Sequence, residues 1–165
     1  MDPVPNPEST GLIYRLNAGY RFRIAGRDAK NDGIHVDMDI GYQSQRYFER
    51  LSFETGSTLD FFGETSHLGA YFQLNFHKPD RWIFSLRTIG AGASDDKEDT
   101  GSNQAADTHD FGGIFALSLM GAYQLNSNFI LGLRVGYNLQ AYGEKGSDQG
   151  TQHSLTTLAN LAYQF

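Results

Sequence analysis

The 165-residue sequence contains no cysteine, which excludes disulfide bonds and thiolate metal sites. An absence of free thiols also fits an oxidising compartment. Basic residues number 13 against 19 acidic ones, and the net charge of −6 argues against nucleic acid as a partner, because phosphate binding needs a basic face. No apolar run approaches the ~20 residues that a membrane-spanning helix requires. The sequence is therefore not that of a helical membrane protein.

Proline is also scarce, and three of the four prolines lie in the first ten positions, at Pro3, Pro5 and Pro7. Proline cannot donate to a sheet ladder, so this segment is a poor strand. It also lacks the basic start and apolar stretch of a signal peptide. We expect residues 1–10 to form a proline-rich N-terminal tail and residues 11–165 to form one folded domain.

What the sequence has in abundance is an alternation of apolar and polar residues, which is the period of a β-strand. In residues 33–45, for example, the apolar positions are Ile34, Val36, Met38, Ile40 and Tyr42. Seven runs show this pattern, each longer than the ~5–6 residues of a soluble strand and sufficient for the ~9–11 of a membrane strand. They cover residues 11–25, 33–45, 67–77, 82–93, 111–125, 129–140 and 154–165.

The connections between the runs differ in length. Those at residues 77–81 and 126–128 are short, whereas those around 50–66, 94–109 and 143–152 are long and polar. Bacterial outer-membrane barrels combine short periplasmic turns with long extracellular loops. The sequence therefore predicts an all-β, antiparallel, up-and-down transmembrane β-barrel in the bacterial outer membrane, with its N- and C-terminal strand ends in the periplasm.

Two observations indicate that the apolar face of each strand points outward, to lipid. Glycines share the polar face with long charged residues, as a narrow lumen requires. Aromatic residues gather at strand ends, as amphipathic rings do at a bilayer interface. We assign a girdle on the short-turn side to Phe22, Phe76, Trp82, Phe84, Tyr123 and Phe129, with Tyr163, and a second one on the long-loop side to Tyr14, Tyr42, Phe111 and Tyr137. The alternative is a soluble β-barrel or sandwich with the apolar face inside.

The last run, Leu155 to Phe165, has apolar or aromatic residues at alternate positions before a terminal phenylalanine. It resembles the C-terminal strand of outer-membrane barrels. The stretch from Phe111-Gly112-Gly113 to Gly136-Tyr137 also resembles small OmpA-like and OmpW-like barrels. The resemblance implies that the barrel-assembly machinery reads Leu161, Tyr163 and Phe165, and that outer-membrane lipid and lipopolysaccharide surround the protein.

The strand count is a difficulty, because seven runs are visible and bacterial single-chain barrels use an even number. Counting back from a last strand that runs down to the periplasm makes residues 11–25 a descending strand. A further strand could precede them, residues 46–64 could hide an irregular boundary between a pair of strands, or several chains could build one barrel. We expect eight strands.

The interior of an eight-stranded barrel is just wide enough to be filled by side chains. Charges there must pair, since an unpaired one costs several kcal/mol. Arg21 and Arg23 fall across the first hairpin from the acidic pair at 37 and 39. We therefore predict a salt-bridged plug, although an ion pathway would use the same residues. The expected network comprises Arg15, Arg21, Arg23, Asp37, Asp39, Glu49, Arg87 and Arg134.

For function, the sequence favours a structural or interaction barrel whose long loops bind an envelope or host protein. A narrow channel or small-solute transporter is one alternative, and a lipid A-modifying enzyme is another. Adjacent Ser66 and His67, like His153 and Ser154, point to opposite faces of a strand and form no catalytic dyad. The histidines lack metal-ligand spacing and the glycine-rich stretches lack a phosphate-loop ending. We expect no enzyme activity, metal or cofactor.

Overall fold

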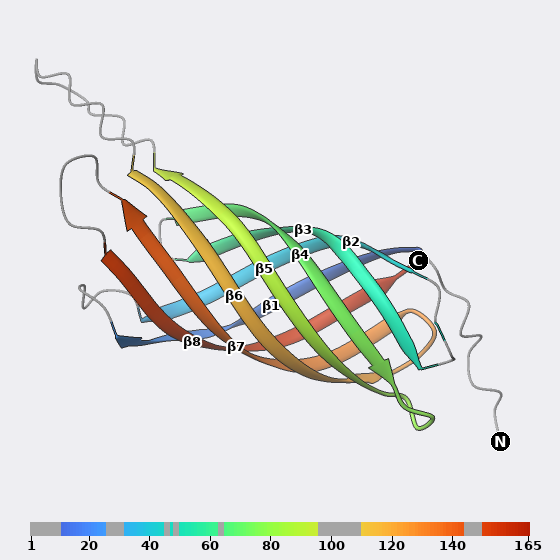
Figure 1. Cartoon of the computed structure of the whole chain (residues 1–165). Coiled ribbons are helices and arrows are strands. Elements are labelled where there is room, and N and C mark those ends of the chain that lie inside the picture. The colour runs from blue at the N-terminus through green and yellow to red at the C-terminus, as the bar shows by residue number, and fades with distance from the viewer. Residues whose placement is uncertain are drawn as a thin grey trace, which may run out of the picture.

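A computed structural model of the chain describes residues 11–25, 32–44, 47, 50–62, 65–95, 110–143 and 150–165. They form one closed barrel in which each strand pairs antiparallel with the next and the last pairs with the first (Figure 1). No helix long and apolar enough to cross a membrane occurs among these residues. The predicted eight-stranded antiparallel barrel is confirmed. Its strands are β1 (Gly11–Ala25), β2 (Gly33–Gln43), β3 (Leu51–Phe62), β4 (Thr65–His77), β5 (Trp82–Asp95), β6 (Asp110–Gln124), β7 (Phe129–Gly143) and β8 (Gly150–Gln164).

The strand that the visible runs lacked is β3, so the expectation of a long polar loop around residues 50–66 is wrong. β3 pairs with β2 from Phe62 to Glu54 and with β4 along its whole length, ending at Phe62 opposite Thr65. The backbone of Tyr47 bridges to Leu51 at the start of β3. The eight strands therefore close within a single chain.

Adding β3 reverses the direction that the seven runs imply for β1 and β2. Gly11 now lies at the same end of the barrel as Gln164 and as the short connections after β4 and β6 (Figure 1). Phe22 is accordingly at the long-connection end, not in the short-turn girdle. Tyr14 and Tyr42 lie at the short-turn end instead, and Tyr14 faces Tyr163 across the β1–β8 seam. These three aromatic assignments were wrong because antiparallel strands alternate in direction.

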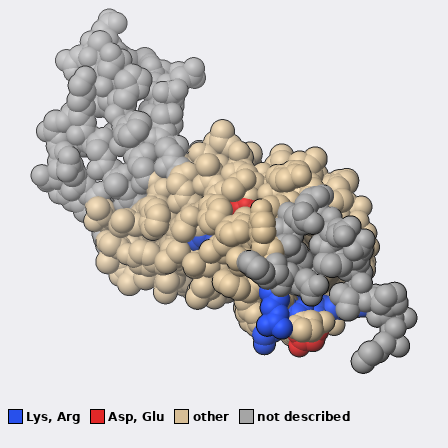
Figure 2. All heavy atoms as spheres, turned by 45° about the vertical axis from the view of Figure 1, so that its right-hand side comes forward, with Lys and Arg blue, Asp and Glu red and all other residues tan. Residues whose placement is uncertain are grey.

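The exterior wall is apolar. Along β7, Leu131, Leu133 and Val135 are about half exposed, whereas Arg134 between them is only 2% exposed. The same alternation runs along the other strands, with polar residues buried and large apolar residues exposed. Figure 2 shows a mostly tan wall, on which most of the blue and red charged side chains gather at one edge. This inverts the usual arrangement of a soluble barrel.

Part of the interior is apolar as well. Near the short-turn end, inward residues of several strands form a buried cluster of Ile13, Ile83, Met120, Ala122, Ile130 and Ala162. This cluster was not predicted from the sequence, although its members stand in phase with the inward polar positions. It lies in the lumen toward the end that carries the short connections.

Candidate functional site: the barrel lumen

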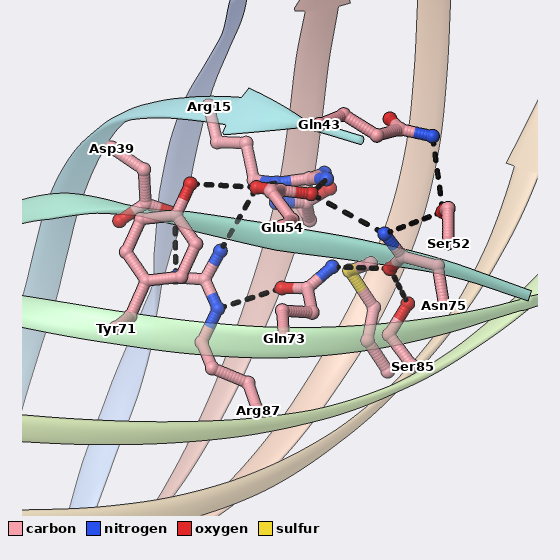
Figure 3. A network of polar contacts seen from close by, with 12 residues as sticks. Arg15, Asp39, Gln43, Ser52, Glu54, Tyr71, Gln73, Asn75, Ser85 and Arg87 are labelled. Carbon is pink, nitrogen blue, oxygen red and sulfur yellow. Dashed lines mark hydrogen bonds and ion pairs between the residues drawn. The ribbon is translucent and has the colours of Figure 1, made fainter. Parts of the chain in front are cut away.

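The centre of the lumen holds Glu54, a fully buried carboxylate on β3 (Figure 3). Arg15 on β1 donates to both of its oxygens, through Nε at 3.1 Å and Nη2 at 2.5 Å. The hydroxyl of Tyr71 on β4 donates to Oε1 at 2.6 Å, and Asn75 donates to Oε2 at 3.4 Å. The two-pronged arginine contact fixes geometry as well as charge. Three side chains, from β1 and β4, therefore donate hydrogen bonds to one carboxylate.

Arg87 on β5 is the second centre of the network. Its Nη1 donates to Asp39 Oδ2 at 2.6 Å, its Nε donates to Gln73 Oε1 at 2.7 Å, and its Nη2 lies 4.0 Å from Glu54 Oε1. The guanidinium also stacks 4.0 Å above the ring of Tyr71. Since β2 and β5 are not neighbours in the sheet, the Arg87–Asp39 ion pair crosses the lumen (Figure 3).

Amides extend the network to the barrel seam. Asn17 on β1 donates to Asp37 and, at 3.3 Å, to Asp39, while Asn160 on β8 donates to Asn17. Toward the short-turn end, a second polar group consists of Gln43, Ser52, Asn75, His77 and Ser85. Polar side chains from β1 to β5 and from β8 thus meet in the lumen.

Arg21 differs from its expected pairing. Its cross-strand neighbour on β2 is Gly33, so the structure does not place it opposite Asp37 or Asp39. Instead its Nη2 lies 3.3 Å from Oδ2 of Asp60 on β3, whose other oxygen lies 2.6 Å from His35 Nε2. Neither Glu54 nor Asp60 was predicted as a lumen residue, because both lie in the segment interpreted as a loop. Glu49 and the side chain of Arg23 fall outside the described part of the chain.

Arg134 is in the lumen as expected, but it joins no ion pair with any described carboxylate. Its Nη2 lies 3.9 Å from the sulfur of Met120 on β6. Its Nε and Nη1 are buried with no hydrogen-bond partner among the described residues. The network therefore connects the other described lumen arginines, Arg15, Arg21 and Arg87, to acids and leaves Arg134 apart.

Two small cavities flank the central network. One, of about 30 Å³, is lined by residues nearer the long-connection end, among them His35, Thr58, Ser118 and Arg134. The other, of about 10 Å³, lies nearer the short-turn end between Arg15 and Ile130. A single water needs ~10–15 Å³ on this measure, so each has room for only one or two water-sized occupants. No cluster of three or more metal-ligating side chains occurs in the described ranges.

The outer surface carries the remaining predicted residues. Phe76, Trp82, Phe84, Tyr123 and Phe129 all lie at the short-turn end, where Trp82 contacts Tyr123 at a ring distance of 5.3 Å. Phe129 contacts Tyr163 at 5.0 Å, and Tyr163 contacts Phe165 at 4.7 Å. Leu161 and Phe165 are exposed on the same outer face. One aromatic band therefore surrounds the short-turn end.

A closed antiparallel barrel with an apolar wall and a charged, buried interior defines the class of small outer-membrane-type β-barrels. Within that class, the chain is similar in structure to Neisserial surface protein A (NspA), with a TM-score of 0.60, 16% identity, and coverage of 94% of this chain and 97% of that one. A NanC porin structure also aligns, with a TM-score of 0.44, 10% identity, and coverage of 92% and 98%. No family model and no curated protein matches the sequence. The likeness to NspA shows the shared barrel fold.

Proposed function

We propose that the chain is an integral protein of the bacterial outer membrane that acts as a structural or interaction barrel with a closed lumen. Its strands of 11–15 residues meet or exceed the ~9–11 that a tilted membrane strand needs. Exposed Leu, Ile, Val and Phe side chains cover the wall, and hydrocarbon is the surrounding that suits such a surface.

The observation that carries the closed lumen is the ion pair from Arg87 on β5 to Asp39 on β2, together with the Arg15–Glu54 pair. All four side chains are almost completely buried. Removing one partner of a buried pair costs about 3–5 kcal/mol, because the other charge is left uncompensated. Solutes that pass the lumen would have to separate these pairs. The proposed activity therefore belongs to the outer surface and the connections.

The proposed orientation places the short-turn end, with the ends of β1 and β8, in the periplasm. Short periplasmic turns and longer outer connections are the rule in bacterial barrels. The connections 26–31, 96–109 and 144–149, which would contact lipopolysaccharide and an envelope or host protein, lie outside the described residues. Biogenesis by the barrel-assembly machinery would use the outward residues Leu161, Tyr163 and Phe165 of the last strand.

Conductance in planar bilayers tests the closed lumen. We expect the wild-type protein, inserted at controlled copy number, to give no steady single-channel steps. Steady steps that change in size with Arg87→Gln would instead establish the channel alternative, for which the two cavities on either side of the network would be the path. A variant on the outer wall, Leu119→Ala, serves as the control, since it leaves the lumen unchanged.

Orientation and catalysis are tested in cells. Because the chain has no cysteine, Ser127→Cys in the turn after β6 provides a single label site. A membrane-impermeant maleimide should label this thiol only after the outer membrane is opened, and labelling of intact cells would reverse the orientation.

The proposal also includes no enzymatic activity. An altered acyl pattern of lipid A in expressing cells, shown by mass analysis, would contradict it.

A further inference from the structure

The cavity on the long-connection side of the network has a donor that the network does not use. Arg134 on β7 lines this cavity and is 2% exposed. Its Nε and Nη1 have no hydrogen-bond partner in the described part of the chain, and its one side-chain hydrogen bond among the described residues is to the weak acceptor Met120 Sδ. A buried guanidinium whose N–H groups have no hydrogen-bonded acceptor is unfavourable, even where carboxylates lie at longer range. An acceptor in the cavity would therefore stabilise this side chain.

Two buried hydroxyls line the same cavity and lack hydrogen-bond partners among the described residues. Ser118 is on β6, next to the strand of Arg134, and Thr58 is on β3, which lies three strands from β6 and four from β7 around the barrel. Buried polar atoms in proteins are almost always hydrogen-bonded, so the unsatisfied donors of Arg134, Ser118 and Thr58 around one cavity indicate a shared occupant.

The acids that line the cavity already have hydrogen-bond or ion-pair partners. Asp60 contacts His35 and Arg21, and Asp37 accepts a hydrogen bond from Asn17. Neither Asp37 nor Asp60 forms an ion pair with Arg134, for which a nitrogen and an oxygen would have to lie within 4.0 Å. The free cationic donors thus face the cavity from the β6–β7 side, where the inward neighbours Ala116 and Met120 carry no charge.

We propose that this cavity binds a small monovalent anion of halide size, held by the guanidinium of Arg134 and the hydroxyls of Ser118 and Thr58. The volume of about 30 Å³ admits one or two water-sized particles, which excludes phosphate esters and sugars. Charge-assisted hydrogen bonds from arginine to an anion are stronger than neutral ones, so the anion competes well with water for the guanidinium. The site is independent of whether the lumen conducts.

Anomalous diffraction from crystals of the detergent-purified protein grown in sodium bromide locates the anion. We expect a bromide peak in the cavity within hydrogen-bond distance of Arg134. The solution counterpart is the unfolding temperature measured in chloride and in gluconate at equal ionic strength. Chloride should raise it with a saturating dependence, since a ligand of the folded state stabilises by mass action.

Matched serine variants separate the site from general effects on the lumen. Ser118→Ala should need several-fold more chloride for half of the shift, whereas Ser85→Ala, a buried lumen serine outside the cavity, should keep the wild-type midpoint. Arg134→Met should abolish the shift. Identical unfolding temperatures in the two salts, or no bromide peak, would overturn the proposal. A peak without any chloride effect in solution would mean an adventitious ion only and would also overturn it.

Discussion

The hydroxyl of Tyr71 donates a 2.6 Å hydrogen bond to Glu54 from the space that a side chain at position 41 would occupy. Gly41 on β2 is buried on the inner face, and a Cβ there would overlap the Tyr71 hydroxyl. The absence of one methyl group on β2 thus allows a tyrosine on β4 to reach a carboxylate on β3. Arg87 stacks on the same ring, so this relationship also supports the second centre of the network.

Gly41→Ala should therefore displace Tyr71 and lower the free energy of unfolding by about 1–3 kcal/mol, through overpacking and a weakened hydrogen bond to Glu54. Urea titration of the protein in lipid vesicles measures the loss. Gly90→Ala on the outer face of β5 is the matched control, because a Cβ there meets no atom within 4 Å. Equal losses in the two variants would contradict the role assigned to Gly41.

The ion pair that crosses the lumen makes a separate prediction. Arg87→Met should destabilise the barrel by about 3–5 kcal/mol, because Asp39 is left charged and buried. Adding Asp39→Leu should restore part of the loss, with a coupling energy of about 0.5–3 kcal/mol in a double-mutant cycle. Strictly additive losses would show that the two side chains do not stabilise one another. The same urea titration provides all four corners of the cycle.

The outward face of β7 is tested by Leu133→Arg. Leu133 is 55% exposed near the middle of its strand, and a cation on the lipid face at the bilayer midplane costs about 2–4 kcal/mol. The folded fraction in vesicles, detected as the band that shifts on boiling in a detergent gel, should fall. Asn138→Arg, on the inner face of the same strand, should be tolerated better. Similar damage from both would argue against the assignment of faces.

The last strand makes a prediction about biogenesis. Tyr163→Ala should reduce the folded fraction severalfold in cells, where the barrel-assembly machinery is expected to read this strand. Refolding of the purified variant into vesicles should change much less. Phe115→Ala on the outer face of β6 removes a similar exposed ring and should leave both yields close to wild type. A Tyr163→Ala defect of the same size in vitro would indicate a packing role with Phe129 and Phe165.

Much of the fold could be predicted because alternation requires no knowledge of distant contacts. β3 escaped detection for a physical reason: its outward face carries Thr55 and Ser57 between the apolar pairs at its ends. Two polar residues in the middle of the outward face of a strand resemble a loop in sequence. That single omission reversed two strands, misplaced Phe22, Tyr14 and Tyr42, and concealed Glu54 and Asp60.

The lumen was predictable in composition but not in its pairing. Inward positions follow from the alternation, so Arg15, Arg87, Arg134, Asp37 and Asp39 were identified correctly as buried. Their partners depend on strand register and on which walls face one another across the barrel. Arg15 pairs with Glu54 over 39 positions of the chain and Arg87 with Asp39 over 48, and no local pattern encodes such distances.

The seam between β1 and β8 brings Asn160 into contact with Asn17, 143 positions earlier in the chain. Until β8 has been synthesised, β1 and β7 each present a row of backbone amides and carbonyls without partners, which hydrocarbon does not tolerate. If the protein spans the outer membrane as proposed, a chain truncated before β8 would not be stable in the bilayer. Insertion would then follow completion of translation, and until then the apolar strands would have to be kept apart in water, because exposed strand edges aggregate readily.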